Sequence, residues 1–208
     1  MGGEIEHRVL CRAATARRRE LLGRLGLPFG IIDLDVPEHR QPGEPAEDYV
    51  RRVAREKAGA GLLKVMGNPA AVVLGSDTEV VLDDDVFGKP RDAEDAAAML
   101  RKLSGRTHQV ISAVSLVSPS REAQTVSVSD VSFAALTEAQ IAAYLAGDQW
   151  QGKAGAYAIQ GFAETFISCL NGSYSGVMGL PVHETAVLLR QFGLEPMPAE
   201  STRQVATP

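Results

Sequence analysis

The stretch that decides the fold is Ala71-Val72-Val73-Leu74-Gly75-Ser76-Asp77-Thr78. An unbroken apolar run of this kind, bounded by Asn68-Pro69 and by Gly75, predicts a fully buried central strand of an α/β fold. Open α/β sheets bind ligands at the carboxyl ends of their strands, so a carboxylate directly after the run is well placed for chemistry. Asp77 is therefore the first candidate for a catalytic residue, and the alternative is that it only caps a turn.

The composition is that of an ordinary globular protein. The chain has 208 residues, of which 45% are hydrophobic, and its net charge is −5. This size and apolar content predict one domain over residues 1–194, arranged as two lobes around a cleft. Residues 195–208 carry three prolines and few apolar side chains, which predicts a disordered tail.

The same numbers exclude several classes of function. A negative net charge argues against binding of duplex nucleic acid, which depends on neutralising phosphates. No stretch approaches the roughly 20 apolar residues of a membrane span, and the N-terminus lacks the order of a signal peptide. The two cysteines and four histidines have no spacing typical of disulfides or zinc sites. A location in the cytoplasm is therefore expected.

Basic side chains gather at a few places. A short strand over Val9-Leu10-Cys11 is followed by a helix expected over 17–25, with Thr15 as its N-cap and Arg17-Arg18-Arg19 in its first turn. Cations oppose the dipole at a helix start, so their presence there favours a bound anion. A solvated basic turn is the alternative. A second cluster, Arg51-Arg52, could also help to hold one polyphosphate.

A long polar loop over 35–45 follows a second expected strand over 30–34, and loops of this length are often functional. Pro45 then opens a helix whose apolar face includes Tyr49, Val53 and Lys57. A lysine on that face either extends out to solvent or reaches a cleft that holds an anion.

The rest of the chain alternates between strands, turns and capped helices. We expect a hairpin turn at Asp83-Asp84-Asp85, a helix capped by Asp92, strands over 108–117 and 126–133, a helix with a capping box at Thr137 and Gln140, a strand over 165–170, a type I′ hairpin turn at Asn171-Gly172 and a last helix ending near Phe192.

Together these segments resemble the Maf family of nucleoside triphosphate pyrophosphatases, whose fold is related to that of inosine triphosphate pyrophosphatases. The resemblance extends from Val9 to about Phe192. It rests on Arg17–Leu22, Tyr49–Ala58, Gly75-Ser76-Asp77-Thr78, Gly88-Lys89-Pro90, Leu103–His108, Lys153–Gly161 and Val177–Pro181. It implies an α/β fold, with a mixed sheet flanked by helices around a central cleft.

The resemblance also implies an activity and a set of site residues. The activity is cleavage of a nucleoside triphosphate between its α and β phosphates, with Mg²⁺ or Mn²⁺ as cofactor. The implied catalytic residues are Asp77, Lys57 and Lys89, and the implied metal ligands are Glu38 and Asp77. The implied substrate-binding residues are Thr15, Arg17, Arg18, Thr78, Lys153 and Gln160. Members of the family are often homodimers.

Three positions bear on the substrate. Arg17, Thr78 and Gln160 look like the branch of the family that acts on dTTP and UTP, whereas Ser76 resembles the 7-methyl-GTP branch. The family's first loop usually runs Ser-x-Ser-Pro, but here it is Ala13-Ala14-Thr15-Ala16. A nucleotide-binding regulator of cell division and septum formation that has lost catalysis is therefore an alternative, as is a 7-methyl-GTP pyrophosphatase.

Overall fold

The computed structural model of the chain describes residues 9–11 and 16–198. Thr15, expected to cap a helix and to bind substrate, lies outside the described residues, as does most of the loop that departs from the family pattern. So does the part of the expected tail beyond residue 198.

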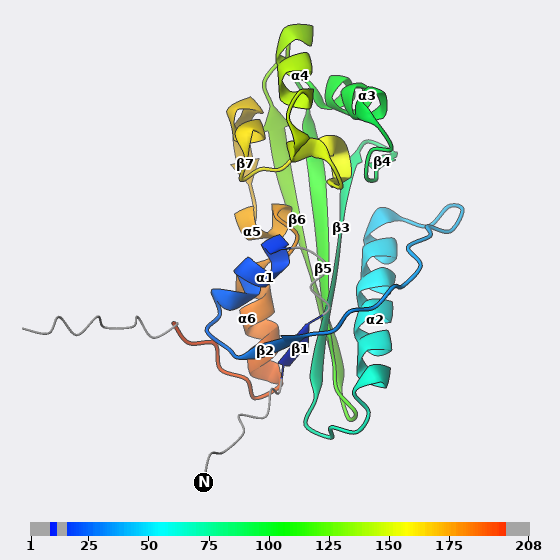
Figure 1. Cartoon of the computed structure of the whole chain (residues 1–208), viewed down its shortest axis with the longest axis vertical. Coiled ribbons are helices and arrows are strands. Elements are labelled where there is room, and N and C mark those ends of the chain that lie inside the picture. The colour runs from blue at the N-terminus through cyan, green and yellow to red at the C-terminus, as the bar shows by residue number, and fades with distance from the viewer. Residues whose placement is uncertain (1–8, 12–15, 199–208) are drawn as a thin grey trace, which may run out of the picture.

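The described residues form a seven-stranded mixed sheet with the order β2-β1-β3-β5-β6-β7, in which β4 pairs with β3 (Figure 1). The β1–β2 and β1–β3 pairs are parallel, and the other pairs are antiparallel. The strands are β1 (Val9–Cys11), β2 (Phe29–Ile31), β3 (Val72–Leu82), β4 (Asp85–Phe87), β5 (Thr107–Val117), β6 (Glu122–Phe133) and β7 (Ile167–Asn171).

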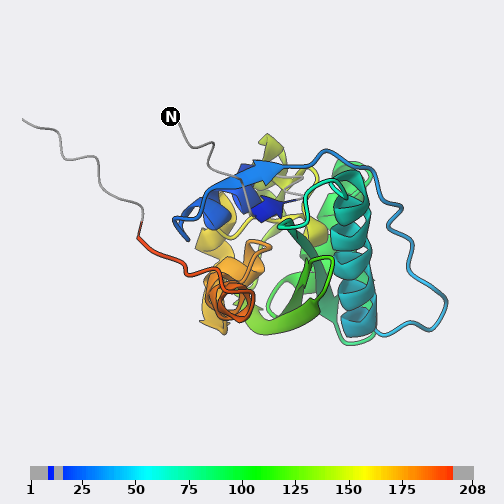
Figure 2. The same ribbon diagram turned by 90° about the horizontal axis from the view of Figure 1, so that it is seen from below.

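Helices cover both faces of the long strands. Helix α2 runs along one face of β3 and β5, whereas α5 and α6 pack against β5 and β6 (Figures 1 and 2). Helices α3 and α4 pack together at one end of the long strands. The helices are α1 (Ala16–Gly23), α2 (Ala46–Lys64), α3 (Ala93–Leu103), α4 (Glu138–Leu145), α5 (Tyr174–Val177) and α6 (Val182–Gln191).

Strand β3 corrects the expectation that Asp77 follows the end of a strand. Asp77 lies in the middle of β3, because β5 pairs with it continuously from Val73 to Val81 and keeps it extended. The other edge of β3 is different. There β1 pairs only as far as Leu74 and the pairing with β4 begins at Val80, and within the described residues no strand covers the segment between them. Asp77 therefore lies beside a gap in the sheet.

Helix α2 packs on β3 very closely, and Gly75 is the reason. A Cβ atom at Gly75 would lie 2.2 Å from the carbonyl oxygen of Ala54 and 2.6 Å from the amide nitrogen of Ala58. Real Cβ atoms do not approach backbone so closely, so only glycine permits this distance between helix and strand. The close approach sets how far side chains on α2 reach over the strand.

Most of the local predictions are confirmed. The Asp92 N-cap, the capping box of Thr137 and Gln140 and the turn between β3 and β4 are all present. The second strand is shorter than expected, since it ends at Ile31.

The expected hairpin at Asn171-Gly172 is wrong, because β7 is followed by a helix instead of a strand. Ser173 caps that helix by accepting a hydrogen bond from the Gly176 amide. In the described residues, no helix has both the length and the apolar character needed to cross a bilayer.

Candidate active site

A cavity of about 420 Å³ lies beside the gap in the sheet. Its charged lining residues form two sets by sign, and Thr78, Tyr157 and Gly179 also line it. The acidic set is Glu38, Asp77 and Glu79, together with Lys57, and the basic set is Arg17, Arg18, Lys89 and Lys153. A polyanion that carries a metal ion would match this combination of charges, since its phosphates need cations and its metal needs carboxylates.

Lys57 is the centre of the acidic set. Its Nζ atom lies 2.6 Å from Asp77 Oδ1 and 2.7 Å from Glu38 Oε1. The Lys57 and Asp77 side chains are only 5% and 7% exposed, whereas Glu38, on the loop before α2, is 34% exposed. Lys57 therefore reaches into the cleft, and the alternative that it extends to solvent is wrong.

The two carboxylate oxygens of Asp77 differ in their hydrogen bonding. Oδ1 accepts the hydrogen bond from Lys57, whereas Oδ2 is buried and has no hydrogen-bond partner among the described residues. A buried carboxylate oxygen without a partner is costly, so its presence in a cavity indicates a group that binds there. Water, a metal ion or a protonated ligand could fill that position.

Glu79 is a third carboxyl group on this wall, and sequence reasoning missed it. It follows Asp77 by two residues on β3, so both side chains project from the same face of the strand. Burial, with the negative charges of Asp77 and Glu38, raises the pKa of Glu79 to about 8. Its Oε2 is also buried without a hydrogen-bond partner among the described residues. Glu79 is therefore mostly protonated at pH 7, so the negative charge of this wall is carried by Asp77 and Glu38.

The basic set comes from separate segments. Arg17 and Arg18 lie in the first turn of α1, as predicted, while Arg19 is exposed and is not among the residues that line the cavity. Lys89 and Lys153 come from two loops that are joined by a hydrogen bond from the Gly155 amide to the Gly88 carbonyl, 3.2 Å long.

The basic groups repel one another, which is the electrostatic sign of an anion site. Burial, followed by the charge of Arg18, lowers the pKa of Arg17. Burial also lowers the pKa of Lys153, and the charges of Arg17 and Lys89 lower it further. An anion between these groups would relieve both the repulsion and the loss of hydration.

The segment after α5 closes the other side of the cavity. The Gly179 carbonyl accepts hydrogen bonds from Arg18 Nε at 3.0 Å and from Ser76 Oγ at 2.9 Å. Ser76 is buried, so its side chain is a structural tie between β3 and this segment. Thr78 Oγ1 lies 2.7 Å from Ser112 Oγ, which in turn donates to the Gly176 carbonyl.

Two sequence predictions concern residues that do not line the cavity. Gln160 is exposed and is not among the residues that line the cavity, so its substrate role stays a prediction. Arg51 and Arg52 do not line it either. Arg51 pairs with Glu47 and Arg52 with Glu44 and Glu56, so the prediction that this pair holds a polyphosphate is wrong.

The donor set fits a divalent cation that is shared with a substrate. Among the described residues, no three His, Cys, Asp or Glu side chains are grouped to hold a metal ion by themselves. Glu38 and Asp77 contact the same ammonium group, so these two carboxylates lie close together. Mg²⁺ in nucleotide enzymes is commonly held by one or two carboxylates and completed by phosphate oxygens and water. The open Oδ2 of Asp77 is consistent with that arrangement.

Behind the cavity lies an aromatic group that sequence reasoning also missed. Tyr157 lines the cavity and its hydroxyl lies 2.8 Å from His108 Nε2, while Phe133 packs edge-on against both rings. Burial lowers the pKa of His108 to about 4, so the ring is neutral at pH 7. The neutral imidazole fixes the Tyr157 ring as a rigid part of the wall.

Comparison with known proteins places the chain in a family. Residues 13–192 match the family model described as Maf-like protein. The chain belongs to the Maf family. The Maf segments quoted from the sequence supply Asp77, Lys57, Lys89, Arg17, Arg18 and Lys153, and all of them line the cavity.

Close relatives of the chain are similar to it over most of its length. The chain is 61% identical over 181 residues to a protein of Xanthomonas euvesicatoria named dTTP/UTP pyrophosphatase, with 86% of this chain and 95% of the relative covered. It is 60% identical over 176 residues to a Xylella fastidiosa protein named nucleoside triphosphate pyrophosphatase, with 84% and 93% covered. Among solved structures, the Staphylococcus aureus Ham1 protein matches at 14% identity and a TM-score of 0.44, over 60% of this chain and 71% of that one.

Proposed function

We propose that this Maf protein hydrolyses a nucleoside triphosphate to the monophosphate and pyrophosphate, with dTTP and UTP as its substrates. The names of its close relatives support the proposal. The observation that carries it is Asp77, whose Oδ1 is held by Lys57 and whose buried Oδ2 has no hydrogen-bond partner among the described residues. That carboxylate and the basic set line the same cavity.

In the proposed reaction a water molecule attacks the α phosphorus. Asp77 Oδ2 orients this water and accepts its proton. A new bond forms between the water oxygen and the α phosphorus, and the bond from the α phosphorus to the bridging oxygen breaks. Pyrophosphate leaves with that oxygen, and the monophosphate stays behind. Lys57 keeps the Asp77 carboxylate in one orientation throughout.

The basic set binds the phosphates in this proposal. Lys89, 67% exposed, lies at the mouth of the cavity, with its Nζ 3.9 Å from Glu38 Oε2. There it is placed to bind the pyrophosphate as it leaves. Arg17, Arg18 and Lys153 bind the remaining phosphate oxygens, and Thr15 is proposed to add a hydroxyl donor. Positive groups that are already fixed around the developing charge stabilise the transition state without reorganisation.

Glu38 and Asp77 are the groups proposed to hold Mg²⁺ or Mn²⁺. When bound, such an ion would neutralise phosphate charge and make a bound water more acidic. Preference for a pyrimidine base is proposed to depend on Arg17, Thr78 and Gln160. The proposed setting is the cytoplasm, and size-exclusion chromatography of the purified protein tests whether it is a homodimer.

A nucleotide panel tests the function. The purified chain is incubated with Mg²⁺ and dTTP, UTP, dCTP, GTP or 7-methyl-GTP, and pyrophosphate and orthophosphate are measured separately. We expect pyrophosphate, released fastest from dTTP and UTP, and about 10³-fold less of it from Asp77→Asn. Orthophosphate alone would refute cleavage between the α and β phosphates. Thermal stabilisation by dTTP without any product would instead favour the nucleotide-binding regulator.

A further inference from the structure

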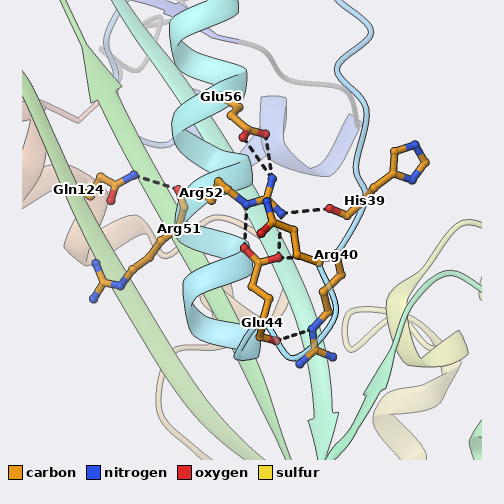
Figure 3. Close-up of polar contacts among 8 residues, drawn as sticks. His39, Arg40, Glu44, Arg51, Arg52, Glu56 and Gln124 are labelled. Atoms are coloured by element: carbon orange, nitrogen blue, oxygen red, sulfur yellow. Dashed lines mark hydrogen bonds and ion pairs between the residues drawn. The ribbon is translucent and has the colours of Figure 1, made fainter.

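Glu38 lies on an irregular segment, and something has to hold that segment against the cavity. The segment between β2 and α2, residues 32–45, has no helix or strand of its own in the described structure. Ile32 is buried, but residues 37–43 are all exposed, so hydrophobic packing does not fix the course of the segment around Glu38. Polar contacts with α2 do so instead, and most of them converge on Arg52 (Figure 3).

Arg52 binds the segment on both sides of a bend. Its Nε and Nη2 atoms donate to the two carboxylate oxygens of Glu44, at 2.7 and 2.8 Å. Nη2 also donates to the main-chain carbonyl of His39 at 3.0 Å, and His39 directly follows Glu38. The guanidinium group thus ties the residue next to Glu38 to the end of the segment and to the helix.

The segment itself reinforces the contact. Glu44 Oε2 also accepts from the Gln41 amide at 3.0 Å, and the Glu44 carbonyl accepts from Arg40 Nε at 2.8 Å (Figure 3). The Glu44 side chain is only 11% exposed and that of Arg52 is 28% exposed. A bidentate arginine–carboxylate pair that is this sheltered has a defined geometry, unlike a mobile surface pair.

The guanidinium also reaches the cavity wall. It lies over the ring of Tyr49, 5.5 Å from the ring centre, and Tyr49 lines the cavity next to Glu38 and Lys57. Arg52 and Lys57 are on the same helix, so a single rigid element fixes both the segment and the ammonium group that Glu38 contacts. The position of Glu38 relative to Asp77 is therefore set from α2.

We infer that Arg52 is a positioning residue: through its clasp on His39 and Glu44 it holds Glu38 at the Lys57–Asp77 pair. This inference rests on the proposed hydrolysis, in which Glu38 is a metal-holding carboxylate. Arg52 is not among the residues that line the cavity, so it acts on the rate through Glu38. An ammonium group cannot span a carbonyl and both oxygens of a carboxylate, so lysine cannot replace it fully.

The test combines kinetics with hydrogen–deuterium exchange on the full chain. Arg52→Met is expected to lower kcat for dTTP with Mg²⁺ on the order of 10- to 100-fold, since small displacements of a site group cost that much. Arg52→Lys should fall in between. Exchange of amides in residues 35–44 should rise in both variants. The matched control is Arg51→Met on the same helix, because Arg51 pairs with Glu47 and points away from the segment (Figure 3). This variant should change neither kcat nor the amide exchange of residues 35–44.

A double variant separates positioning from a general loss of stability. If Arg52 acts through Glu38, Arg52→Met combined with Glu38→Gln should be no slower than Glu38→Gln alone. Losses that multiply, or an equal loss in Arg51→Met, would overturn the inference. If the wild-type chain released no pyrophosphate, the proposed function would fail. Amide exchange alone would then test whether Arg52 holds the segment, and unchanged exchange in Arg52→Met would refute that role.

Discussion

Two regions of the site hold their carboxylates in opposite ways. One is the floor of the cavity, formed by β3 around Asp77 with α2 packed on it, and the other is the segment over residues 32–45 that carries Glu38. Asp77 lies in the middle of β3, where pairing with β5 and the close approach of α2 leave no freedom. Glu38 lies on a segment without regular structure, held by a clasp of side chains. Both carboxylates contact the same lysine. The comparison shows that one site can combine a group fixed by backbone packing with one fixed by hydrogen bonds.

The largest expected effect on the rate comes from a substitution of Asp77 on the floor. Asp77→Asn removes the proposed proton acceptor, and pyrophosphate release from dTTP should fall about 10³-fold, within the usual range for a general base. Circular dichroism should show an unchanged fold, because asparagine has nearly the same shape. Turnover close to that of the wild type would mean that the water is activated elsewhere.

Gly75→Ala should disrupt the packing of α2 on β3 through a clash with the main chain of the helix. The added methyl group would meet main-chain atoms of α2 at 2.2 and 2.6 Å, so the helix has to move away from β3. We expect a loss of about 3 kcal/mol in the free energy of unfolding, measured by urea denaturation. The same variant should raise the amide exchange of α2. A stability within error of the wild type would show that helix and strand adjust freely.

The aromatic group behind the cavity and the segment should also differ in the pH range over which they affect stability. Burial lowers the pKa of His108 below its ordinary 6.5, to about 4, so the unfolded chain takes up a proton before the folded one does. Stability from this group is full above pH 6.5 and falls as pH drops toward 4, by up to about 3 kcal/mol. Urea denaturation from pH 4 to 7 should show this slope in the wild type and lose it in His108→Gln. His183→Gln, at an exposed histidine, is the control and should keep it.

On the segment, hydrogen bonds from Arg52 lower the pKa of Glu44 to about 2. Its contribution is present above the ordinary value of 4.5 and is lost only as pH falls toward 2. The clasp should therefore persist at pH 5, where the stability that depends on neutral His108 has already fallen.

Glu38→Gln should have a smaller effect than Asp77→Asn. The amide keeps the shape of the side chain but removes one of two carboxylates offered to the metal, so we expect activity to fall about 10- to 100-fold. A higher Mg²⁺ concentration should recover part of the loss, which a titration of rate against Mg²⁺ would measure. No dependence of the loss on Mg²⁺ would argue against a metal role for Glu38.

The smallest effect should come from the segment's own glycine. Gly43 has φ +73°, but a Cβ atom there would meet nothing within 4 Å. Gly43→Ala should therefore cost only about 1 kcal/mol, from the left-handed backbone alone. Set beside Gly75→Ala in the same urea experiment, it measures how much more tightly the floor is packed than the segment.

The floor was largely predictable, and the segment was not. The apolar run at Val72–Leu74 indicated a buried strand without any knowledge of its partners, and local signals gave the Asp92 and Thr137 caps. The length of β3 depended on β5, which begins 25 residues after β3 ends, so the place of Asp77 within the strand was missed. The contacts of Arg52 with His39 and Glu44 could not be predicted, because the dipeptide Arg51-Arg52 does not indicate which arginine faces the loop.

The same contrast holds within the cavity. Arg17 and Arg18 were predicted because arginines at a helix start are unusual by themselves, whereas the roles of Lys89 and Lys153 were implied by the family resemblance. Glu79 was missed because one acidic residue in a strand is ordinary until Asp77 and Glu38 are placed beside it. Thr15 and Gln160 remain predictions, the first because it lies outside the described residues and the second because it is exposed.

The contact between Lys57 and Asp77 also has a consequence for folding. The two residues are 20 positions apart, on α2 and on β3, which follow each other directly in the chain. Contacts of short sequence separation need little loop closure and tend to form early. We expect this helix–strand unit to form the centre of the site before β6 and β7 complete the sheet. Transition-state analysis of variants in α2 would then give high φ-values where variants in β7 give low ones.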